Sequence, residues 1–444
     1  MKRIGLNEHF TYRKLFLFTL PSVVMAIFTS VYTIVDGVFV SRVVGDSAFT
    51  GLNLIFPMLM ILGAIGLMFG AGGSALIAKT LGEGDRERAN GYFSFFLIVI
   101  AIAGVVFAAL VFALLRPVAE LIGKRASREA VEYSILYGGV CLIGLPFLML
   151  QYSFQSFMLT AEKATLGFFV TVIAGVTNAI LDATFILGFH WGLAGAAAAT
   201  VVGQVLGGLI PVLYFARKNN SLLHITKPRF EWRALVKACT NGSSEFLTNI
   251  SAAIVNMLYN MQLLRLAGDS GVNAFGVIMY ENTVFMGIFF GYAMGVAPAV
   301  GYHFGAQNRK ELHNLLKKSL LLVGVAGLVL ALCSVGLSSP FAHIFAKEES
   351  VYVLTRDGIR IYSVAYVMMG FGVFASSFFT ALNNGFISAL ISFLRTCVFQ
   401  CGAILLLPLL WDITGVWIST AVAEALSLAV CIFCFVFMRK KYGY

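Results

Sequence analysis

Charged side chains are scarce in this sequence. Asp, Glu, Lys and Arg together make up 12% of its 444 residues, which is about half of their share in average soluble domains. Hydrophobic residues make up 59%, and the mean hydropathy is +0.89. This composition excludes a soluble globular protein. It indicates a membrane protein with many spans and no space for a sizeable soluble domain.

Motifs of metal and catalytic sites are also missing. All cysteines except Cys239 lie inside apolar runs, and no His or second Cys pair accompanies the two closely spaced cysteine pairs, so zinc ligation is not expected. The glycine-rich runs lack the strand and Lys context of a nucleotide-binding loop and are expected to pack helices. No zinc-protease, triad or kinase pattern occurs. We therefore expect neither an enzyme nor a cofactor.

What the sequence does have is long apolar runs. The N-terminus lacks the short apolar core and cleavage site of a signal peptide, because its first apolar run is already long enough to be a span. We expect an all-α polytopic membrane protein of twelve transmembrane helices. The spans are expected at 14–40, 50–79, 91–115, 131–159, 165–189, 192–216, 236–266, 272–304, 312–337, 352–381, 386–410 and 413–438.

The chain is expected to consist of two six-helix halves. Residues 1–216 form an N-terminal bundle, 217–235 a cytoplasmic connector and 236–444 a C-terminal bundle. Gly45-Asp46-Ser47 recurs as Gly268-Asp269-Ser270, and the same offset of 223 residues relates Gly72 to Gly295. Because six spans is an even number, both halves enter the membrane in the same direction and form parallel repeats.

The net charge of +10 comes from basic residues in the connections between spans. With both termini in the cytoplasm, the cytoplasmic segments carry most of the Lys and Arg, as the positive-inside rule requires. The basic loop at 116–128 is the exception. Orientation explains this charge better than nucleic acid does, so no nucleic-acid partner is expected.

One carboxylate stands out in the first span. Asp36 lies in an apolar stretch, 21–45, with no basic residue within a helical turn. A carboxylate at membrane depth costs about 2.5–3.5 kcal/mol and therefore needs a proton, a cation or a polar partner. The stretch indicates an ion-binding site. The alternative is that Asp36 lies near the outer end of its helix and reaches water.

Further oxygen ligands occur in the fifth and sixth spans. Asn178 and Asp182 are four residues apart and share a helix face, and Thr200 lies in an Ala-rich stretch of the next span. With Asp36 they would offer two carboxylates, an amide oxygen and a hydroxyl, which suits Na⁺. Two neighbouring carboxylates would equally suit a proton. The alternative for Asn178 and Asp182 is hydrogen bonding between helices.

The second half lacks this set and has other ionisable residues. Glu281 lies about ten residues into its span, and with Met279, Tyr280 and Met286 it is a candidate for contact with a cationic substrate. Hydrogen bonding to a neighbouring helix is the equal alternative. Glu245 and Glu424 are interpreted as residues near the membrane interface, and Arg395 is expected to pair with a carboxylate or a helix C-terminus.

The chain resembles the multidrug and toxic compound extrusion (MATE) family over essentially its whole length. The resemblance rests on the two halves, on TSVYTIVDGVFVSRVVGDSAFTGLNLIFP (29–57) and on the loops GEGDRERAN (82–90) and GAQNRKELHN (305–314). It is closest to the bacterial branch named after the DNA-damage-inducible F protein and to its staphylococcal-type multidrug exporters. The resemblance implies a cation site at Asp36, Asn178, Asp182 and Thr200. Another branch has acidic ligands in the middle of the seventh and tenth spans, where the corresponding stretches of this chain, 249–257 and 364–374, have no carboxylate.

The resemblance implies a secondary active antiporter. It would export lipophilic, often cationic, compounds, antibiotics among them, in exchange for H⁺ or Na⁺, without a cofactor. We expect a monomer in the bacterial cytoplasmic (inner) membrane, surrounded by lipid, with both termini cytoplasmic. The alternative is a lipid-linked precursor flippase of related architecture, which would need a strongly cationic cavity. A passive channel is disfavoured because buried carboxylates suit stoichiometric coupling.

Overall fold

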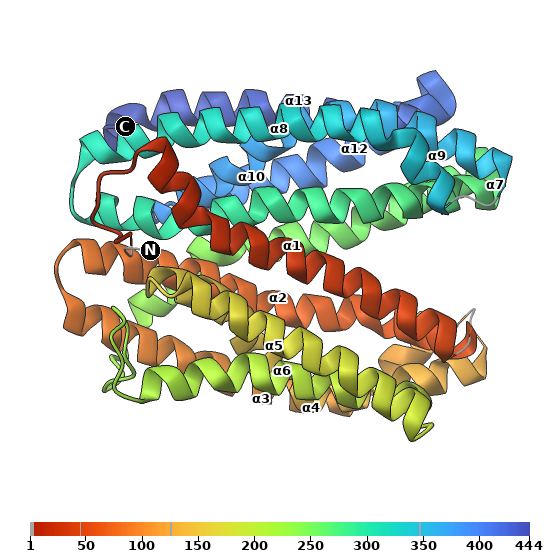
Figure 1. Cartoon of the computed structure of the whole chain (residues 1–444), viewed down its shortest axis with the longest axis horizontal. Coiled ribbons are helices and arrows are strands. Elements are labelled where there is room, and N and C mark those ends of the chain that lie inside the picture. Colours follow the sequence, from red (N-terminus) through yellow and green to blue (C-terminus); the bar gives the residue numbers. More distant parts are fainter. Residues whose placement is uncertain (1–3, 45, 125–126, 346–347) are drawn as a thin grey trace. The chain divides into compact units, whose positions relative to one another are not determined.

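A computed structural model describes residues 4–44, 46–124, 127–345 and 348–444, without the side chains at positions 35, 36, 38–42, 46 and 345. The described chain is helical (Figure 1). Its elements are α1 (Tyr12–Val43), α2 (Asp46–Gly82), α3 (Arg86–Ile122), α4 (Arg128–Thr160), α5 (Ala164–Asp182), η1 (Ala183–Gly188), α6 (Gly192–Ala216), α7 (Trp232–Gly305), α8 (Arg309–Phe345), α9 (Glu349–Tyr362), η2 (Ser363–Ala365), α10 (Tyr366–Ala381), α11 (Gly385–Phe393), η3 (Leu394–Phe399), α12 (Gln400–Leu406) and α13 (Pro408–Tyr442).

Eleven helices in the described part of the chain are long and apolar enough to cross a membrane. One of them, α7, has 74 residues, whereas a single span needs about 20. Its backbone is non-helical at Gly268, where φ is 60° and ψ is −152°. This conformation favours glycine, and it separates the predicted spans 236–266 and 272–304. The all-helical fold with twelve predicted spans is thus confirmed.

Short polar motifs begin several helices. Asp85 accepts a hydrogen bond from the backbone N–H of Arg88 and caps α3. Ser127 caps α4 and Asn384 caps α11 in the same way. Each cap satisfies a backbone donor that the first helical turn leaves free, so tight connections can link long helices.

The described chain divides into two compact units. One, here called the N-terminal unit, contains residues 24–242, and the other, the C-terminal unit, contains residues 1–23 and 243–444. The unit boundaries therefore fall inside α1 and α7. The division at the connector 217–235, inferred from the sequence, remains a prediction.

Glycines permit close packing of helices within each unit. In the N-terminal unit, a Cβ added at Gly72 would lie 1.9 Å from the backbone oxygen of Ala238, so α2 touches the first turns of α7. In the C-terminal unit, a Cβ at Gly295 would lie 2.2 Å from the Ser22 hydroxyl, so α7 touches the first turns of α1. The glycines related by the 223-residue offset thus have equivalent roles, as small residues at helix interfaces.

The connector lies against the start of α3 in the N-terminal unit. The backbone N–H of Thr226 donates to the Ser94 hydroxyl at 2.8 Å, and the Tyr92 hydroxyl donates to Glu231 at 2.6 Å. The hydrogen bond from Tyr92 lowers the pKa of the Glu231 carboxyl from its ordinary value, with further help from Arg88. These contacts fix the connector to its own unit.

Both chain ends lie at one end of the C-terminal unit (Figure 1). The backbone N–H of Phe10 donates to Glu311, at the start of α8, at 2.9 Å. The ring of Tyr442, at the end of α13, packs edge-on against Phe304, at the end of α7. The two termini are therefore on the same side of this unit.

Candidate functional site

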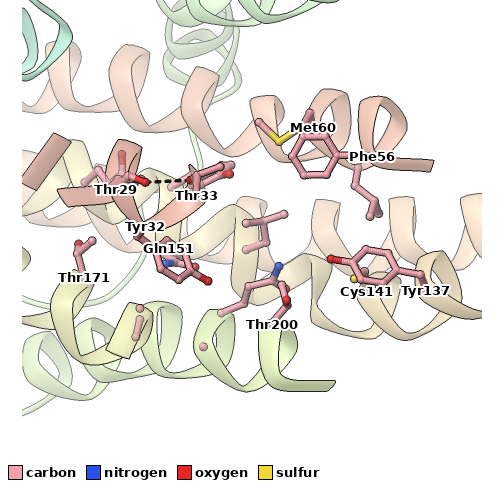
Figure 2. A pocket seen from close by; sticks show the side chains of 18 residues that line it. Thr29, Tyr32, Thr33, Phe56, Met60, Tyr137, Cys141, Gln151, Thr171 and Thr200 are labelled. Carbon is pink, nitrogen blue, oxygen red and sulfur yellow. Dashed lines mark hydrogen bonds between the residues drawn. The ribbon is translucent and has the colours of Figure 1, made fainter. Parts of the chain in front are cut away.

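A cavity of about 180 Å³ with hydroxyl and amide groups in its wall lies inside the N-terminal unit (Figure 2). Five helices line it: α1, α2, α4, α5 and α6. The polar part of its wall consists of neutral hydroxyl and amide side chains, namely Thr29, Tyr32, Thr33, Tyr137, Gln151, Tyr152, Gln155, Thr171, Thr200 and Gln204. Phe56, Leu59 and Met60 of α2 contribute an apolar wall. No Asp or Glu is in the wall among side chains that the structure describes.

Asn178 and Asp182 are not among the residues of this wall; they lie on α5, with only 1% and 2% of their surfaces exposed. The Tyr32 hydroxyl of α1 donates a hydrogen bond to the Asn178 side-chain oxygen. The two helices pack closely here, since a Cβ added at Gly175 would lie 3.0 Å from the Phe28 ring. Tyr32 therefore links the cavity wall to the buried amide.

Asp36 lies in α1, but its side chain is outside the described part of the structure. Its place in the helix is four residues after Tyr32, just as Asp182 is four residues after Asn178. Residues four apart are neighbours on one helix face. Along α1, Met25, Phe28 and Tyr32 approach successively later residues of α5, so the two helices run in the same direction.

Thr200 lines the cavity from α6. One turn later on the same helix, a Cβ added at Gly203 would lie 3.2 Å from the Cβ of Asn178. The structure thus brings together the three helices that carry the four predicted ligands, namely α1, α5 and α6. Asn178 lies at the contact between α5 and α6. Hydroxyl, amide and carboxylate oxygens suit a hard monovalent cation or a proton.

A π-helix, η1, begins directly after Asp182. Segments of this kind are rare and often occur at functional sites. A second π-helix, η3, contains Arg395 in the eleventh predicted span. Each unit therefore has a π-helix next to a buried charged residue, and no feature of the sequence indicated this.

Glu281 and its neighbours lie in the C-terminal unit, on α7. Glu281 is 9% exposed and Tyr280 is 36% exposed, while Met279 and Met286 are partly buried. Because successive residues on a helix point in different directions, these four side chains do not share one face. Their role as a substrate site remains a prediction.

The C-terminal unit contains a buried ion pair. The Nε of Arg395 donates to both carboxylate oxygens of Glu424, at 2.9 and 3.0 Å. The interpretation of Glu424 as a residue near the interface is wrong, because only 4% of it is exposed and its charge is paired inside the helix bundle. Of the two alternatives expected for Arg395, a carboxylate or a helix C-terminus, the structure shows pairing with a carboxylate.

The amides of the cavity wall were not predicted from the sequence. Gln151 and Gln155 are four residues apart in α4, and Gln204 follows Thr200 by four residues in α6. Amide side chains with helical spacing inside apolar spans are the signal that would have identified them. Within the described residues, no group of three or more His, Cys, Asp or Glu suited to a metal ion is found.

Comparison with known proteins gives consistent matches over nearly the whole chain. A family model described as MatE matches residues 21–184 and 246–402. The multidrug export protein MepA of Staphylococcus haemolyticus is 21% identical over 440 residues, 98% of this chain and 95% of that protein. MepA of Staphylococcus aureus strain N315 is 21% identical over 432 residues, 96% of this chain and 93% of that protein.

Solved structures show the same fold. A MATE protein in complex with MaL6 aligns with a TM-score of 0.92 and 23% identity, covering 100% of this chain and 99% of its own. A transporter of the MOP superfamily from Pyrococcus furiosus, described as having a binding pocket of reversed polarity that suggests a different function, aligns with a TM-score of 0.89 and 23% identity, covering 100% and 98%. The predicted architecture of two six-helix bundles is confirmed by these alignments.

Proposed function

This chain belongs to the MatE family, and we propose that it is a secondary active antiporter that exports lipophilic, often cationic, compounds in exchange for H⁺ or Na⁺. It is a membrane transporter and not an enzyme. The observation that carries the proposal is the hydrogen bond from Tyr32, in the wall of the cavity, to Asn178, which lies one helical turn before the buried carboxyl group of Asp182. A buried carboxylate beside a water-sized or larger cavity is suited to ion uptake. The MepA relatives, named as multidrug export proteins, support the export function.

The proposed ion site consists of Asp36, Asn178, Asp182 and Thr200. Asp36 and Asp182 would supply the negative charge, and Asn178 and Thr200 neutral oxygens. Tyr32 would act as a positioning residue, because its hydroxyl holds the Asn178 amide. When the site binds a proton or Na⁺, the repulsion between its carboxylates falls. The bound ion therefore favours helix arrangements that hold the two carboxylates close together.

Transport would follow from alternating access of the two predicted bundles, residues 1–216 and 236–444, with the connector 217–235 between them. Ion binding and drug binding would each favour a different arrangement, so that one displaces the other through differential affinity. The chain would be a monomer in the lipid of a bacterial cytoplasmic membrane, with both termini in the cytoplasm. The predominance of basic residues in the expected cytoplasmic loops supports this orientation.

Substrate contact is proposed for Glu281, with Met279, Tyr280 and Met286 as adaptable apolar neighbours. Glu281 is the carboxylate that lies about ten residues into its span, and one of its oxygens, Oε2, has no hydrogen-bond partner among the described residues. A fixed negative charge in apolar surroundings would favour cationic substrates over neutral ones.

The alternative function is a flippase for lipid-linked precursors. Such a protein would need buried positive charge for a pyrophosphate group. Arg395, the base inside the eleventh predicted span, is instead neutralised by Glu424. Arg395 therefore does not offer the unpaired positive charge that a pyrophosphate group would need.

Efflux of ethidium tests the proposal. In a pump-deficient bacterial strain, expression of the chain should speed ethidium efflux when an inward H⁺ or Na⁺ gradient is imposed. Collapse of the gradient that drives efflux should abolish the gain. Equal efflux with and without either gradient would refute antiport, and efflux of neutral lipid precursors alone would favour the flippase.

A further inference from the structure

An apolar groove of about 550 Å³ lies on the C-terminal unit, between α11 and α13. Its most deeply buried residues are Ile387 of α11 and Cys434 of α13, which are 8% and 4% exposed. Leu390 and Val430 continue the apolar lining on the two helices. The groove shares no residue with the cavity of the N-terminal unit. Its volume is typical of sites that hold an organic ligand.

Aromatic rings form the open edges of the groove. Phe386 of α11 is 75% exposed, and Phe433 and Phe437 of α13 are 66% and 67% exposed. The rings of Phe433 and Phe437 stack with their centres 5.7 Å apart, because residues four apart are neighbours on a helix. All three lie within the predicted spans 386–410 and 413–438. The groove is therefore open to its surroundings at membrane depth.

The groove has a positive charge at one end only. Lys441, in the last turn of α13, lines this end together with Asn384, which caps α11. Both residues lie just outside the two predicted spans. The Lys441 ammonium is 5.4 Å from the centre of the Tyr442 ring, and no salt bridge joins it to a carboxylate among the residues that the structure describes. An unpaired cation thus lies at the membrane interface, directly next to apolar walls.

The length of the groove matches one leaflet of a bilayer. Its lining on α13 extends from Val430 to Lys441, which is about 16 Å at 1.5 Å per residue. The hydrocarbon core of a bilayer is about 30 Å thick, so one leaflet contributes about half of that. A molecule with a charged group at Lys441 and an apolar part of this length would fill the groove.

The sign of the charge identifies the kind of molecule. Lys441 would repel the lipophilic cations that are the proposed substrates, whereas it attracts a phosphate group. The cytoplasmic leaflet contains anionic lipids, and basic residues near its surface attract them. Both termini are expected on that side, so the end of α13 is expected there too. A phospholipid with a net negative charge therefore satisfies the apolar walls, the length and the charge together.

We propose that this groove binds one anionic phospholipid of the cytoplasmic leaflet, with its acyl chains between α11 and α13 and its phosphate at Lys441. Because the lipid would contact both helices, its binding should stabilise their packing and so raise the stability of the protein. The site is separate from the proposed ion and substrate residues. It does not depend on whether the chain is an antiporter.

Titration with defined lipids tests the proposal on the purified full chain in detergent. Phosphatidylglycerol, which is anionic, is compared with phosphatidylcholine that has identical oleoyl chains. Native mass spectrometry counts the bound lipids, and thermal unfolding reports stability. We expect one phosphatidylglycerol molecule to bind about fivefold more tightly than phosphatidylcholine, which is the contribution of one basic residue near a membrane surface. The bound lipid should also raise the unfolding temperature.

Two neighbouring lysines provide matched variants. Lys441→Gln should abolish the preference for phosphatidylglycerol, and Lys441→Arg should keep it. Lys440→Gln removes the same charge from the next residue, which does not line the groove, and should also keep the preference. Leu390→Trp narrows the apolar part and should weaken the binding of both lipids.

Equal effects of Lys440→Gln and Lys441→Gln would overturn the proposal, because they would show only a general attraction of anionic lipid to a basic helix end. Displacement of the lipid by ethidium would assign the groove to an exported compound instead. Dimers that dissociate on adding lipid would assign it to a second copy of the chain. Free glycerol 3-phosphate should leave the bound phosphatidylglycerol in place. Its displacement would refute a site built for the acyl chains.

Discussion

The two units treat buried charge in opposite ways. In the N-terminal unit, Asp182 is buried on α5, one helical turn after Asn178, whose side-chain oxygen accepts a hydrogen bond from Tyr32 in the wall of a cavity lined by hydroxyls and amides. In the C-terminal unit, Glu424 is paired with Arg395, whose Nε lies 2.9 and 3.0 Å from the two carboxylate oxygens. A carboxylate among neutral oxygens can exchange its proton or cation, whereas a paired carboxylate keeps a fixed partner. In two repeats with equivalent glycine contacts, the carboxylates Asp36 and Asp182 therefore form the proposed site that can exchange an ion, here called the exchangeable centre. The pair Arg395–Glu424 is here called the structural centre, because its charges are fixed to each other.

The packing itself is not the source of this difference. Gly72 and Gly295 make equivalent helix contacts in the two units, and both units have a π-helix in the corresponding span. The residues carried by these helices differ: Asn178 and Asp182 in one, Arg395 in the other. A frame repeated within one chain can thus hold different chemistry in each copy, as is common for folds generally.

The largest effect is expected from loss of the exchangeable charge. Asp36→Asn keeps the size of the side chain but cannot gain or lose a proton, so gradient-driven efflux should fall to background. Ethidium efflux, normalised to the amount of inserted protein, measures this. Asp85→Asn is the matched control, because asparagine still caps α3 and efflux should remain normal. Full efflux by a well-inserted Asp36→Asn protein would remove the basis for the ion site.

Removing one charge of the pair Arg395–Glu424 should reduce the stability of the fold. Glu424→Gln leaves Arg395 buried without its counter-charge, and loss of one partner of a buried pair costs about 3–5 kcal/mol of stability. Thermal unfolding in detergent should show this loss. Replacing both partners, Arg395→Met with Glu424→Leu, should recover most of the stability.

An exposed pair provides the control for that measurement. Arg116 and Glu132 are 3.3 Å apart but 60% and 50% exposed, so Glu132→Gln should cost no more than about 1 kcal/mol. Equal losses from Glu424→Gln and Glu132→Gln would contradict a structural role for the buried pair.

Much of this arrangement could be predicted from the sequence, and the reason is physical. Apolar runs of span length leave few alternatives to membrane helices, so the spans, the repeat and the break near Gly268 were all predictable. The isolated carboxylates were also visible, because a charge in an apolar run stands out. The pairing of charged residues on different helices was not visible in the sequence, and Glu424 was misinterpreted for that reason. Its distance from the span end gave no sign of Arg395, which lies 29 residues earlier in the chain.

The neutral lining of the cavity could be predicted only in part. Amide side chains with helical spacing stand out in apolar spans, but sequence alone does not say which amides and hydroxyls face the same cavity. Only the packing of α1, α4, α5 and α6 shows that Tyr32, Gln151 and Gln204 share a wall.

A smaller effect on efflux tests whether Asp36 and Asp182 bind one ion together. If Asp36 and Asp182 bind the same ion, Asp36→Asn combined with Asp182→Asn should be no worse than either change alone, since coupled sites are not additive. Each single variant is expected near background in the first assay, so this comparison needs a steeper gradient or higher expression, at which each single variant still exports measurably. Losses that multiply would show that the two carboxylates serve separate purposes.

The smallest effect is expected at Glu281, and it depends on the charge of the substrate. Glu281→Gln removes a negative charge that is nearly buried on α7, and a partly screened charge interaction is worth on the order of 1 kcal/mol. Apparent affinity for cationic dyes should fall about fivefold, while affinity for neutral compounds and dependence on the driving ion should not change. Asn282→Asp changes the charge at the next residue, whose side chain points in a different direction. This variant is the control for a change of charge that is not at position 281. If all substrates are affected equally, in step with the amount of folded protein, Glu281 serves folding only, and substrate recognition must then be assigned to the neutral cavity of the N-terminal unit.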